Sequence, residues 1–248
     1  MTFVLPSVTY PSSDGEPVAE TFDHLYAILV TLEVLRQYLS GQQATVLANQ
    51  FLYYAQGFPR LRVAPDVMVI FGVAPGGRDN YKIWEEGQVP AAIFEMTSAA
   101  TQQNDTVEKK HLYERLGVRE YWLFDPRGEW VEGRLQGYRL QPVEVTGEVV
   151  EVYLPITDGR SAVLGLRLQV EDRLPAFYRE DTGEKLLIPA ELAEELHRTA
   201  ALLEQERRAR EQERQGREQE RRAREQAERR AAAMAERLRE LGVDPDTV

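Results

Sequence analysis

Two acidic side chains and one lysine have the residue types that phosphodiester chemistry needs. Asp66 follows a proline at the start of an apolar run, and Glu95 lies near the end of another. Two carboxylates brought together repel each other, so they favour the capture of a hard divalent cation such as Mg²⁺. Lys109 follows on a helical pattern, and an ammonium group near that cation is suited to orient water or stabilise a phosphate under attack. These residues predict a metal-dependent nuclease.

Regular secondary structure would bring these side chains together. Alternate residues of a strand share one face, so a strand over 66–70 places Asp66 on the face of Ile70. If that strand pairs antiparallel with the run that contains Glu95, the two acids converge near one end of a sheet. Lys109 and Tyr113 are four residues apart on a predicted helix, so they face the same way.

The hydrophobic pattern predicts a mixed α/β core. Helical spacing over 20–39 predicts a first helix that ends at Gly41 and buries Phe22, Leu25, Leu29, Leu32, Leu35 and Leu39. The next predicted elements are strands at 44–54, 61–71 and 91–96, a helix at 106–116 stopped by Gly117, and a strand at 120–124. Short strands at 130–135, 138–145, 149–154 and 164–170 and a hairpin at 177–187 complete the prediction.

The composition indicates an acidic folded protein. The 248 residues are 43% hydrophobic, enough for a sizeable core, and the absence of cysteine excludes disulfides, thiolate nucleophiles and cysteine-ligated zinc. Residues 1–17 lack the pattern of a signal peptide and no apolar run could span a membrane, so we expect a cytoplasmic protein with no membrane partner. The net charge of −11 repels nucleic acid, unless a bound cation or a local basic patch reverses the sign near the site.

A change of composition near Pro189 predicts two parts, a nuclease-like domain over 1–189 and a charged helical tail over 190–248. Residues 191–248 hold 13 arginines and 15 acids, a net charge of −2, so −9 belongs to the rest. A seven-residue repeat covers 204–224 and consists of strong helix formers apart from Gly216. Its thin seam of Leu202, Ala209, Gly216 and Ala223 leaves two interpretations open, a solvated single helix or a weak coiled-coil homodimer.

The residues between Pro65 and Pro126 resemble a known nuclease pattern. The pattern reads Pro65-Asp66, Glu95-x-x-Ser98, Asp105-x3-Lys109-x3-Tyr113-x3-Gly117, Glu120-Tyr-Trp and Asp125-Pro126. It resembles the PD-(D/E)XK nuclease superfamily and, within it, the Uma-type branch of restriction endonuclease-like proteins. Thr21-x-x-His24, Trp84-x-x-Gly87-x-x-Pro90 and Leu164-Gly-Leu-x-Leu168 also look like that branch. The resemblance implies a restriction-endonuclease-like core, with a central mixed β-sheet flanked by helices.

The resemblance also implies the metal ligands. Asp66 and Glu95 would bind Mg²⁺, with Mn²⁺ as a possible substitute, helped by the backbone carbonyl of Met96. Glu20, at the start of the first helix, is a weaker candidate for an additional ligand, because related nucleases often use an acid there.

The lysine departs from the superfamily pattern. It usually stands two places after the second acid, where this chain has Thr97. In the Uma-type branch the lysine comes from the following helix, which makes Lys109 the candidate and leaves its neighbour Lys110 open.

Ordinary structural roles compete with these assignments. An aspartate after proline is most often a turn residue, and a lysine such as Lys109 in a Glu-Lys-Lys run usually faces solvent. We expect Asp105 to cap a helix rather than bind metal, and Tyr113 and Trp122 to belong to the core rather than stack on DNA. None of the three histidines shows metal-ligand spacing.

The expected function is Mg²⁺-dependent hydrolysis of DNA phosphodiester bonds without an organic cofactor. The resemblance implies products with a 5′-phosphate and a 3′-hydroxyl. The alternative is a catalytically inactive nuclease fold that serves as an interaction or regulatory module with an oligomerising helical tail. The acidic body and the displaced lysine favour that alternative.

Overall fold

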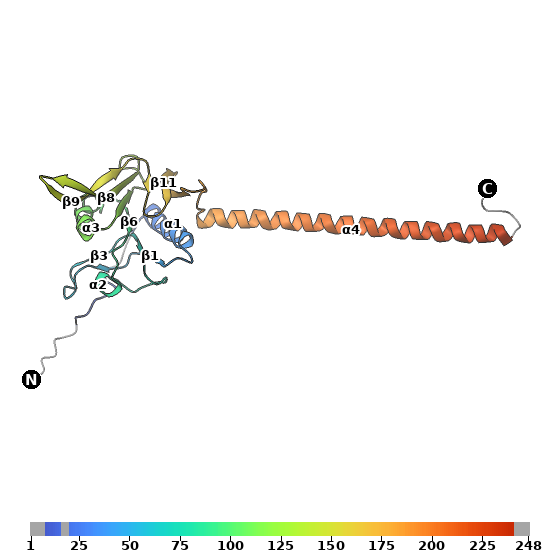
Figure 1. The fold of residues 1–248 in the computed structure, drawn as a ribbon, viewed down its shortest axis with the longest axis horizontal. Coiled ribbons are helices and arrows are strands. Elements are labelled where there is room, and N and C mark those ends of the chain that lie inside the picture. Colours follow the sequence, from blue (N-terminus) through green and yellow to red (C-terminus); the bar gives the residue numbers. More distant parts are fainter. Residues whose placement is uncertain (1–7, 16–19, 241–248) are drawn as a thin grey trace, which may run out of the picture. The chain divides into compact units, whose positions relative to one another are not determined.

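The computed structural model describes residues 8–15 and 20–240 (Figure 1). Residues 1–7 and 16–17 of the segment that lacks a signal-peptide pattern lie outside the described residues. None of the described helices combines the length and the apolar character that crossing a membrane requires. By its contacts the chain divides into two compact units, Met1–Pro189 and Ala190–Val248.

The first unit alternates short helices with strands. Its elements in chain order are α1 (Phe22–Tyr38), β1 (Ala44–Ala48), β2 (Leu52–Tyr53), β3 (Arg62–Val63), β4 (Val67–Phe71), β5 (Tyr81–Lys82), α2 (Ile83–Glu86), β6 (Ala92–Met96), the π-helical η1 (Asn104–Lys109), α3 (Lys110–Leu116), β7 (Glu120–Phe124), β8 (Leu135–Val145), β9 (Glu148–Ile156), β10 (Arg160–Ser161), β11 (Leu166–Glu171) and β12 (Leu174–Arg179). One long helix, α4 (Pro189–Glu240), follows.

A six-stranded sheet forms the centre of this unit, in the order β1-β4-β6-β7-β8-β9. The neighbours β6 and β7 run parallel, joined by the crossover through η1 and α3, whereas the other pairs are antiparallel. Two three-stranded sheets, β10-β11-β12 and β3-β2-β5, accompany it. The predicted α/β fold with a central mixed sheet is therefore confirmed.

Both faces of the sheet are buried at β4, β6 and β7, because alternate residues of these strands enter two different cores. Val69 and Phe94 join α1 and the β11–β12 hairpin in one core. Ile70 and Ile93 join α3 and residues of the β3-β2-β5 sheet in the other. Strands buried on both faces explain the continuous apolar runs of the sequence in this region.

The first helix buries a different face from the one expected. Its buried residues are His24, Ala27, Ile28, Val30, Thr31, Val34 and Leu35. Leu35 and the following Leu39 are buried as predicted, but Phe22, Leu25 and Leu29 are 75%, 44% and 47% exposed. The smaller residues pack closely against the sheet, and the leucine spacing alone could not distinguish the two stripes. The helix begins at Phe22 with Thr21 as its N-cap, so Glu20 lies just outside it.

Several strand predictions need correction. The run 61–71 is two strands of different sheets, β3 and β4. The run 44–54 is two strands of different sheets, β1 and β2, separated by Asn49 with a φ of 54°. Residues 130–134 form no strand, and β8 begins only at Leu135. The turn expected around 181–183 is present: the backbone N–H of Leu186 donates to the Phe177 carbonyl oxygen at 2.8 Å, but the second arm pairs with β12 only through an isolated bridge, Tyr178 to Lys185.

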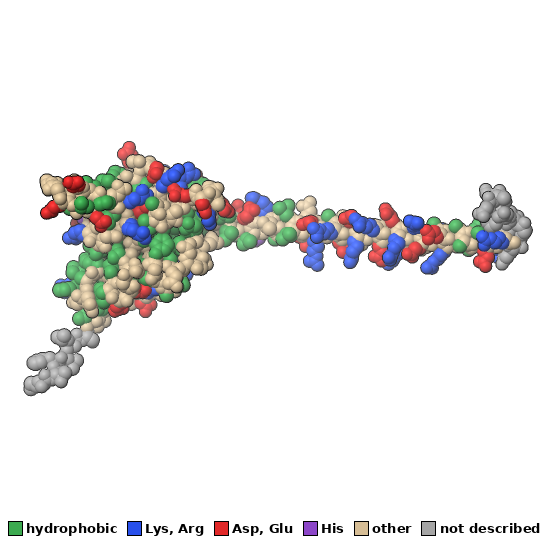
Figure 2. Space-filling view, in the orientation of Figure 1, with side chains coloured by type: hydrophobic (Ala, Val, Ile, Leu, Met, Phe, Trp, Pro, Cys, Tyr) green, Lys and Arg blue, Asp and Glu red, His purple; other side chains and the backbone are tan. Residues whose placement is uncertain are grey.

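The helix α4 spans 52 residues and is rich in glutamate and arginine. Figure 2 shows its blue and red side chains distributed along its length. Ion pairs join side chains four residues apart, with Glu204 to Arg208 at 2.9 Å and Glu206 to Arg210 at 2.5 Å. From Ala193 to Met234 every residue is exposed. Taken as a single chain, α4 is therefore a solvent-exposed helix over these residues.

Candidate active site

Asp66 and Glu95 meet where β4 pairs with β6. The antiparallel register places Val67 opposite Phe94, so the flanking residues Asp66 and Glu95 are neighbours as well. The backbone N–H of Asp66 lies 3.4 Å from Glu95 Oε2, and the backbone N–H of Met96 donates to Asp66 Oδ2 at 2.6 Å. The sheet thus brings together the two acids that were expected to converge.

Lys109 and Tyr113 contact Glu95 from the crossover between β6 and β7. Lys109 Nζ lies 2.8 Å from Glu95 Oε2, and the Tyr113 hydroxyl donates to Glu95 Oε1 at 2.6 Å. Lys110 points elsewhere, with its Nζ 3.7 Å from the centre of the Tyr138 ring. Of the two lysines that the sequence left open, Lys109 is the one that reaches the acids.

Asp105 belongs to the same cluster rather than to a helix cap. It lies inside η1, whose N-cap is Gln103, and only 1% of it is exposed. Lys109 Nζ lies 3.0 Å from Asp105 Oδ1, and the Tyr121 hydroxyl donates to the Asp105 carbonyl oxygen at 2.8 Å. The predicted capping role is wrong, because the helical turn begins before Asp105. Isolated π-helical turns such as η1 frequently occur at functional sites.

Burial dominates the electrostatics of this cluster. It raises the pKa of Glu95 from 4.5 to about 8 despite the nearby charge of Lys109, and it also raises the pKa of Asp105. Burial opposes the charge of Lys109, but the neighbouring carboxylates outweigh it and raise the Lys109 pKa above its ordinary value. Three acids, counting Asp66, therefore share one ammonium group. The excess of negative charge favours an additional cation.

A cavity of about 410 Å³ lies beside Asp66. It is bordered by the start of α1, by residues 97–101 after β6 and by residues 125–130 after β7. Glu20 also lines it, and Glu20 Oε2 is buried without a hydrogen-bond partner among the described residues. The cavity gives a ligand access to the acid cluster from one side.

His24 is a site residue that the spacing of the histidines did not reveal. It projects from the first turn of α1, where its backbone N–H donates to the Thr21 hydroxyl at 3.4 Å, and its Nε2 lies 3.5 Å from Asp66 Oδ2. Burial disfavours the charged imidazole, but the contact with Asp66 outweighs burial and raises the His24 pKa. The signal available in the sequence was the Thr21-x-x-His24 motif, not the spacing of the histidines.

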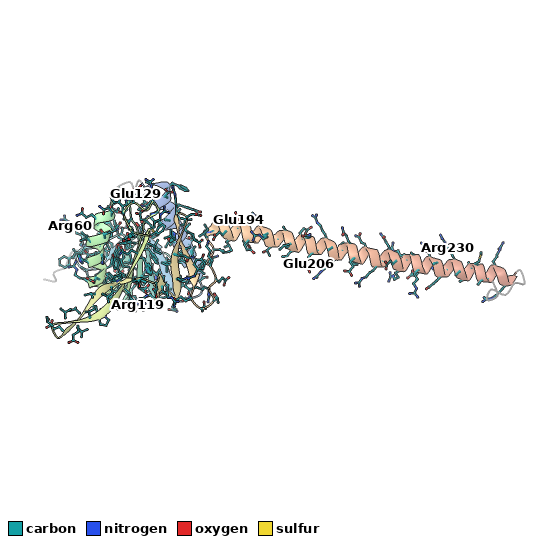
Figure 3. All side chains as sticks on the ribbon, turned by 90° about the horizontal axis from the view of Figure 1, so that it is seen from above. Arg60, Arg119, Glu129, Glu194, Glu206 and Arg230 are labelled. Carbon is teal, nitrogen blue, oxygen red and sulfur yellow. The ribbon has the colours of Figure 1, made fainter. Side chains whose placement is uncertain are left out.

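Asp125 organises the loop on the opposite rim of the cavity. Its carboxylate accepts hydrogen bonds from the backbone N–H groups of Arg127, Gly128, Trp130 and Val131, at 2.6 to 3.1 Å. Burial acts against its ionisation, yet these donors lower the Asp125 pKa below its ordinary value. The loop presents Arg127, Glu129 and Trp130 at the cavity (Glu129 is labelled in Figure 3).

Comparison with known proteins assigns the family. Residues 5–170 match the sequence model of the family described as "Uma2: Putative restriction endonuclease". The chain belongs to the Uma2 family. The resemblance to Uma-type, restriction endonuclease-like proteins is therefore confirmed.

A solved structure is also similar to this Uma2 protein. It is described as a "putative nuclease belonging to DUF820 from Anabaena variabilis ATCC 29413", with 15% sequence identity and a TM-score of 0.38 over 52% of this chain and 70% of that chain. No curated protein matches the chain. The assignment to Uma2 rests on the sequence match.

The oxygen donors at the Uma2 site would supply only part of the coordination shell of a divalent cation. Within residues 8–15 and 20–240, no three His, Asp or Glu side chains are already grouped as a metal site. Mg²⁺ commonly takes only one or two carboxylates and completes its octahedron with waters and substrate phosphates. Adjacent Asp66 and Glu95, with the partnerless Glu20 Oε2 at the same cavity, match that requirement. Their oxygen donors are the kind that Mg²⁺ and Mn²⁺ accept.

Proposed function

We propose that this Uma2 protein is a Mg²⁺-dependent DNA endonuclease that hydrolyses phosphodiester bonds. The observation that carries the proposal is the contact of the Glu95 carboxylate with the Lys109 ammonium group and with the backbone N–H of Asp66, whose residue lines an open cavity. Membership of a family described as "Putative restriction endonuclease" supports DNA as the substrate class. Two carboxylates and one lysine are the functional groups that such a hydrolysis needs.

Asp66 and Glu95 would hold the cation, with the Met96 carbonyl and Glu20 as further candidate ligands. When bound, a divalent cation supplies Lewis-acid stabilisation of phosphate charge and a lowered pKa for water. The backbone N–H of Met96 fixes the orientation of the Asp66 carboxylate. Burial and the charge of Glu95 raise the Tyr113 pKa well above its ordinary value, so Tyr113 stays a donor that orients Glu95.

Lys109 would act on the phosphate or on the attacking water. Its pKa is raised, so it carries a proton at neutral pH, and 13% of its side chain is exposed. A fixed ammonium group stabilises negative charge that develops on a phosphate. Because it is already in place, it need not reorient during the reaction.

An inactive, interaction-only nuclease fold is the second candidate. Two observations favour it: residues 1–190 carry a net charge of −9, from 17 basic and 26 acidic groups, and Lys109 is held between two carboxylates. Such a field weakens binding to DNA, and a lysine neutralised by its neighbours has less charge to offer a phosphate. The two candidates differ in one measurable property, cleavage that depends on metal.

The test is nicking of supercoiled plasmid at low salt by the full chain, with Mg²⁺, with Mn²⁺ and with a chelator. We expect cleavage only with metal, and a loss of about 100-fold or more in Asp66→Asn, Glu95→Gln and Lys109→Gln. Glu132→Gln, which changes an exposed carboxylate outside the cavity, is the matched control and should cleave normally. Thermal unfolding of each variant separates lost chemistry from lost folding.

Two outcomes would reject the nuclease proposal. One is cleavage that persists in the chelator or in Asp66→Asn, since it would arise from a contaminant or another site. The other is the absence of any cleavage by the folded wild-type chain with either metal, which would leave the interaction module as the better account.

A further inference from the structure

One heptad seam of α4 alternates glutamate with arginine over its middle part. Its positions alternate at three- and four-residue spacing and are all exposed. They are Leu196, Thr199, Leu203, Glu206, Arg210, Glu213, Arg217, Glu220, Arg224, Ala227, Ala231 and Met234. We name this set the mixed seam. Apolar or small residues occupy both of its ends, and glutamate alternates with arginine between them.

The mixed seam contains most of the large exposed apolar side chains in the described part of the helix. Leu196, Leu203 and Met234 are 62%, 62% and 67% exposed. Covering side chains of this size removes apolar surface from water, which favours the pairing of two helices. Regular spacing of 3.5 residues on average is the pattern by which helices pair lengthwise.

The order of charges discriminates between the two directions of pairing. In a parallel, in-register pair each seam residue faces its own copy, so every charged layer would hold two like charges. In an antiparallel pair centred midway between Glu213 and Arg217, each seam residue faces the residue of the other copy that lies equally far on the other side of that centre. The facing pairs are then Leu196–Met234, Thr199–Ala231, Leu203–Ala227, Glu206–Arg224, Arg210–Glu220 and Glu213–Arg217. Every charged layer then pairs a glutamate with an arginine, and no charged residue faces an apolar one.

We propose that the tail binds the tail of a second copy of this chain as an antiparallel pair through the mixed seam. Within one chain, Arg210 contacts Glu206 and Arg217 contacts Glu213, but exposed contacts of this kind stabilise a helix only weakly. Because these contacts are weak, the seam side chains can exchange them for contacts with the second copy. Glu206 is labelled in Figure 3, where it extends from the helix.

Antiparallel pairing has a consequence for the two copies. From Leu196 to Met234 the helix rises about 60 Å, at about 1.5 Å per residue. The two Leu196 positions of the pair would therefore lie about 60 Å apart along the axis. The folded units would leave the pair at opposite ends, whereas a parallel pair would hold both at one end.

Disulfide capture tests the direction, because the chain contains no cysteine of its own. Full-length Leu203→Cys and Ala227→Cys proteins are mixed and oxidised mildly. We expect the mixture to cross-link at least about tenfold faster than either variant alone, because only a mixed antiparallel pair brings the two thiols together. Leu202→Cys is the matched control: it is 60% exposed and adjacent but lies outside the seam, so its mixture with Ala227→Cys should cross-link slowly.

Charge reversal gives an independent readout by sedimentation of the full chain. Glu206→Arg puts two like pairs into each dimer and should weaken the dimer about tenfold, and adding Arg224→Glu should restore it. Rapid cross-linking of Leu203→Cys alone would establish a parallel pair and overturn the proposal. So would a wild-type chain that is monomeric at every concentration, a Leu202→Cys mixture that cross-links equally fast, or the absence of rescue in the double variant.

Discussion

At the scale of single residues, the informative group is the carboxylate of Glu95. It is fully buried and makes contacts with Lys109, Tyr113 and the backbone of Asp66. A structural ion pair would be satisfied by the lysine alone, but here Asp66 and Asp105 add negative charge around the same ammonium group. A buried site with more carboxylates than cations is costly to the fold without a cation. Function is the simplest reason to retain it.

That cost predicts a pH dependence of stability for the metal-free protein. The folded state keeps the Glu95 proton up to a pKa of about 8, whereas the unfolded chain loses it near 4.5. Between these values the folded state binds more protons, so the free energy of unfolding should fall as pH rises through this window. Each unit of difference between the folded and unfolded pKa changes the free energy of unfolding by about 1.4 kcal/mol. Below pH 4.5 the group contributes nothing, and above pH 8 the loss is complete.

Urea unfolding at pH 5 and pH 8 measures the effect. Glu95→Gln should flatten the pH dependence, while Glu132→Gln, at an exposed position, should leave it unchanged. Added Mg²⁺ should recover stability at pH 8 in the wild type but not in Glu95→Gln. Equal pH dependence in wild type and Glu95→Gln would show that another group is responsible.

At the scale of elements, the sequence predicted what depends on local pattern and missed what depends on partners. The strand 120–124 was predicted with its observed bounds, and Gly117 ends α3 in the left-handed conformation as expected. The face of α1 was mispredicted because two stripes of similar hydrophobicity coexist, and only contact with the sheet selects one. His24 was missed for a related reason, since its partner Asp66 comes from a distant strand.

The loop after β7 shows why the segment 130–134 was mistaken for a strand. Its apolar residues resemble a strand, but the Asp125 carboxylate takes the N–H groups of Trp130 and Val131 that a strand would give to its neighbour. A single acid thus determines the conformation of the cavity rim. The sequence pattern shows the apolar residues, but it does not show that a carboxylate competes with a neighbouring strand for the backbone N–H groups.

Removing that acid should therefore destabilise a whole element. Asp125→Ala deprives four backbone N–H groups of their acceptor, and we expect a loss of about 2–4 kcal/mol in the free energy of unfolding. Hydrogen exchange should rise in residues 127–131 specifically. The matched control is Asp158→Ala, which removes an exposed acid that accepts one backbone N–H, from Arg160, and should cost less than about 1 kcal/mol. Similar losses in both variants would contradict the role given to Asp125.

At the scale of the whole molecule, the two units obtain their stability from different sources. The unit Met1–Pro189 has two buried cores on the faces of one sheet. The helix α4 has ion pairs along its surface and no buried residue from Ala193 to Met234. Burial of apolar area sets the stability of a domain, whereas exposed ion pairs add little. We therefore propose that residues 1–189 fold independently of the tail.

A chain that ends after Pro189 tests this independence. We expect its free energy of unfolding to lie within about 0.5 kcal/mol of that of the full chain, because the deleted residues bury almost nothing. The full chain should show an additional loss of helix by circular dichroism at high salt, where its exposed ion pairs are screened, and the shortened chain should not. A shortened chain that fails to fold, or that unfolds several kcal/mol more easily, would mean that the tail completes the core. In that case the boundary near Pro189 would mark a change of composition and not a limit between domains.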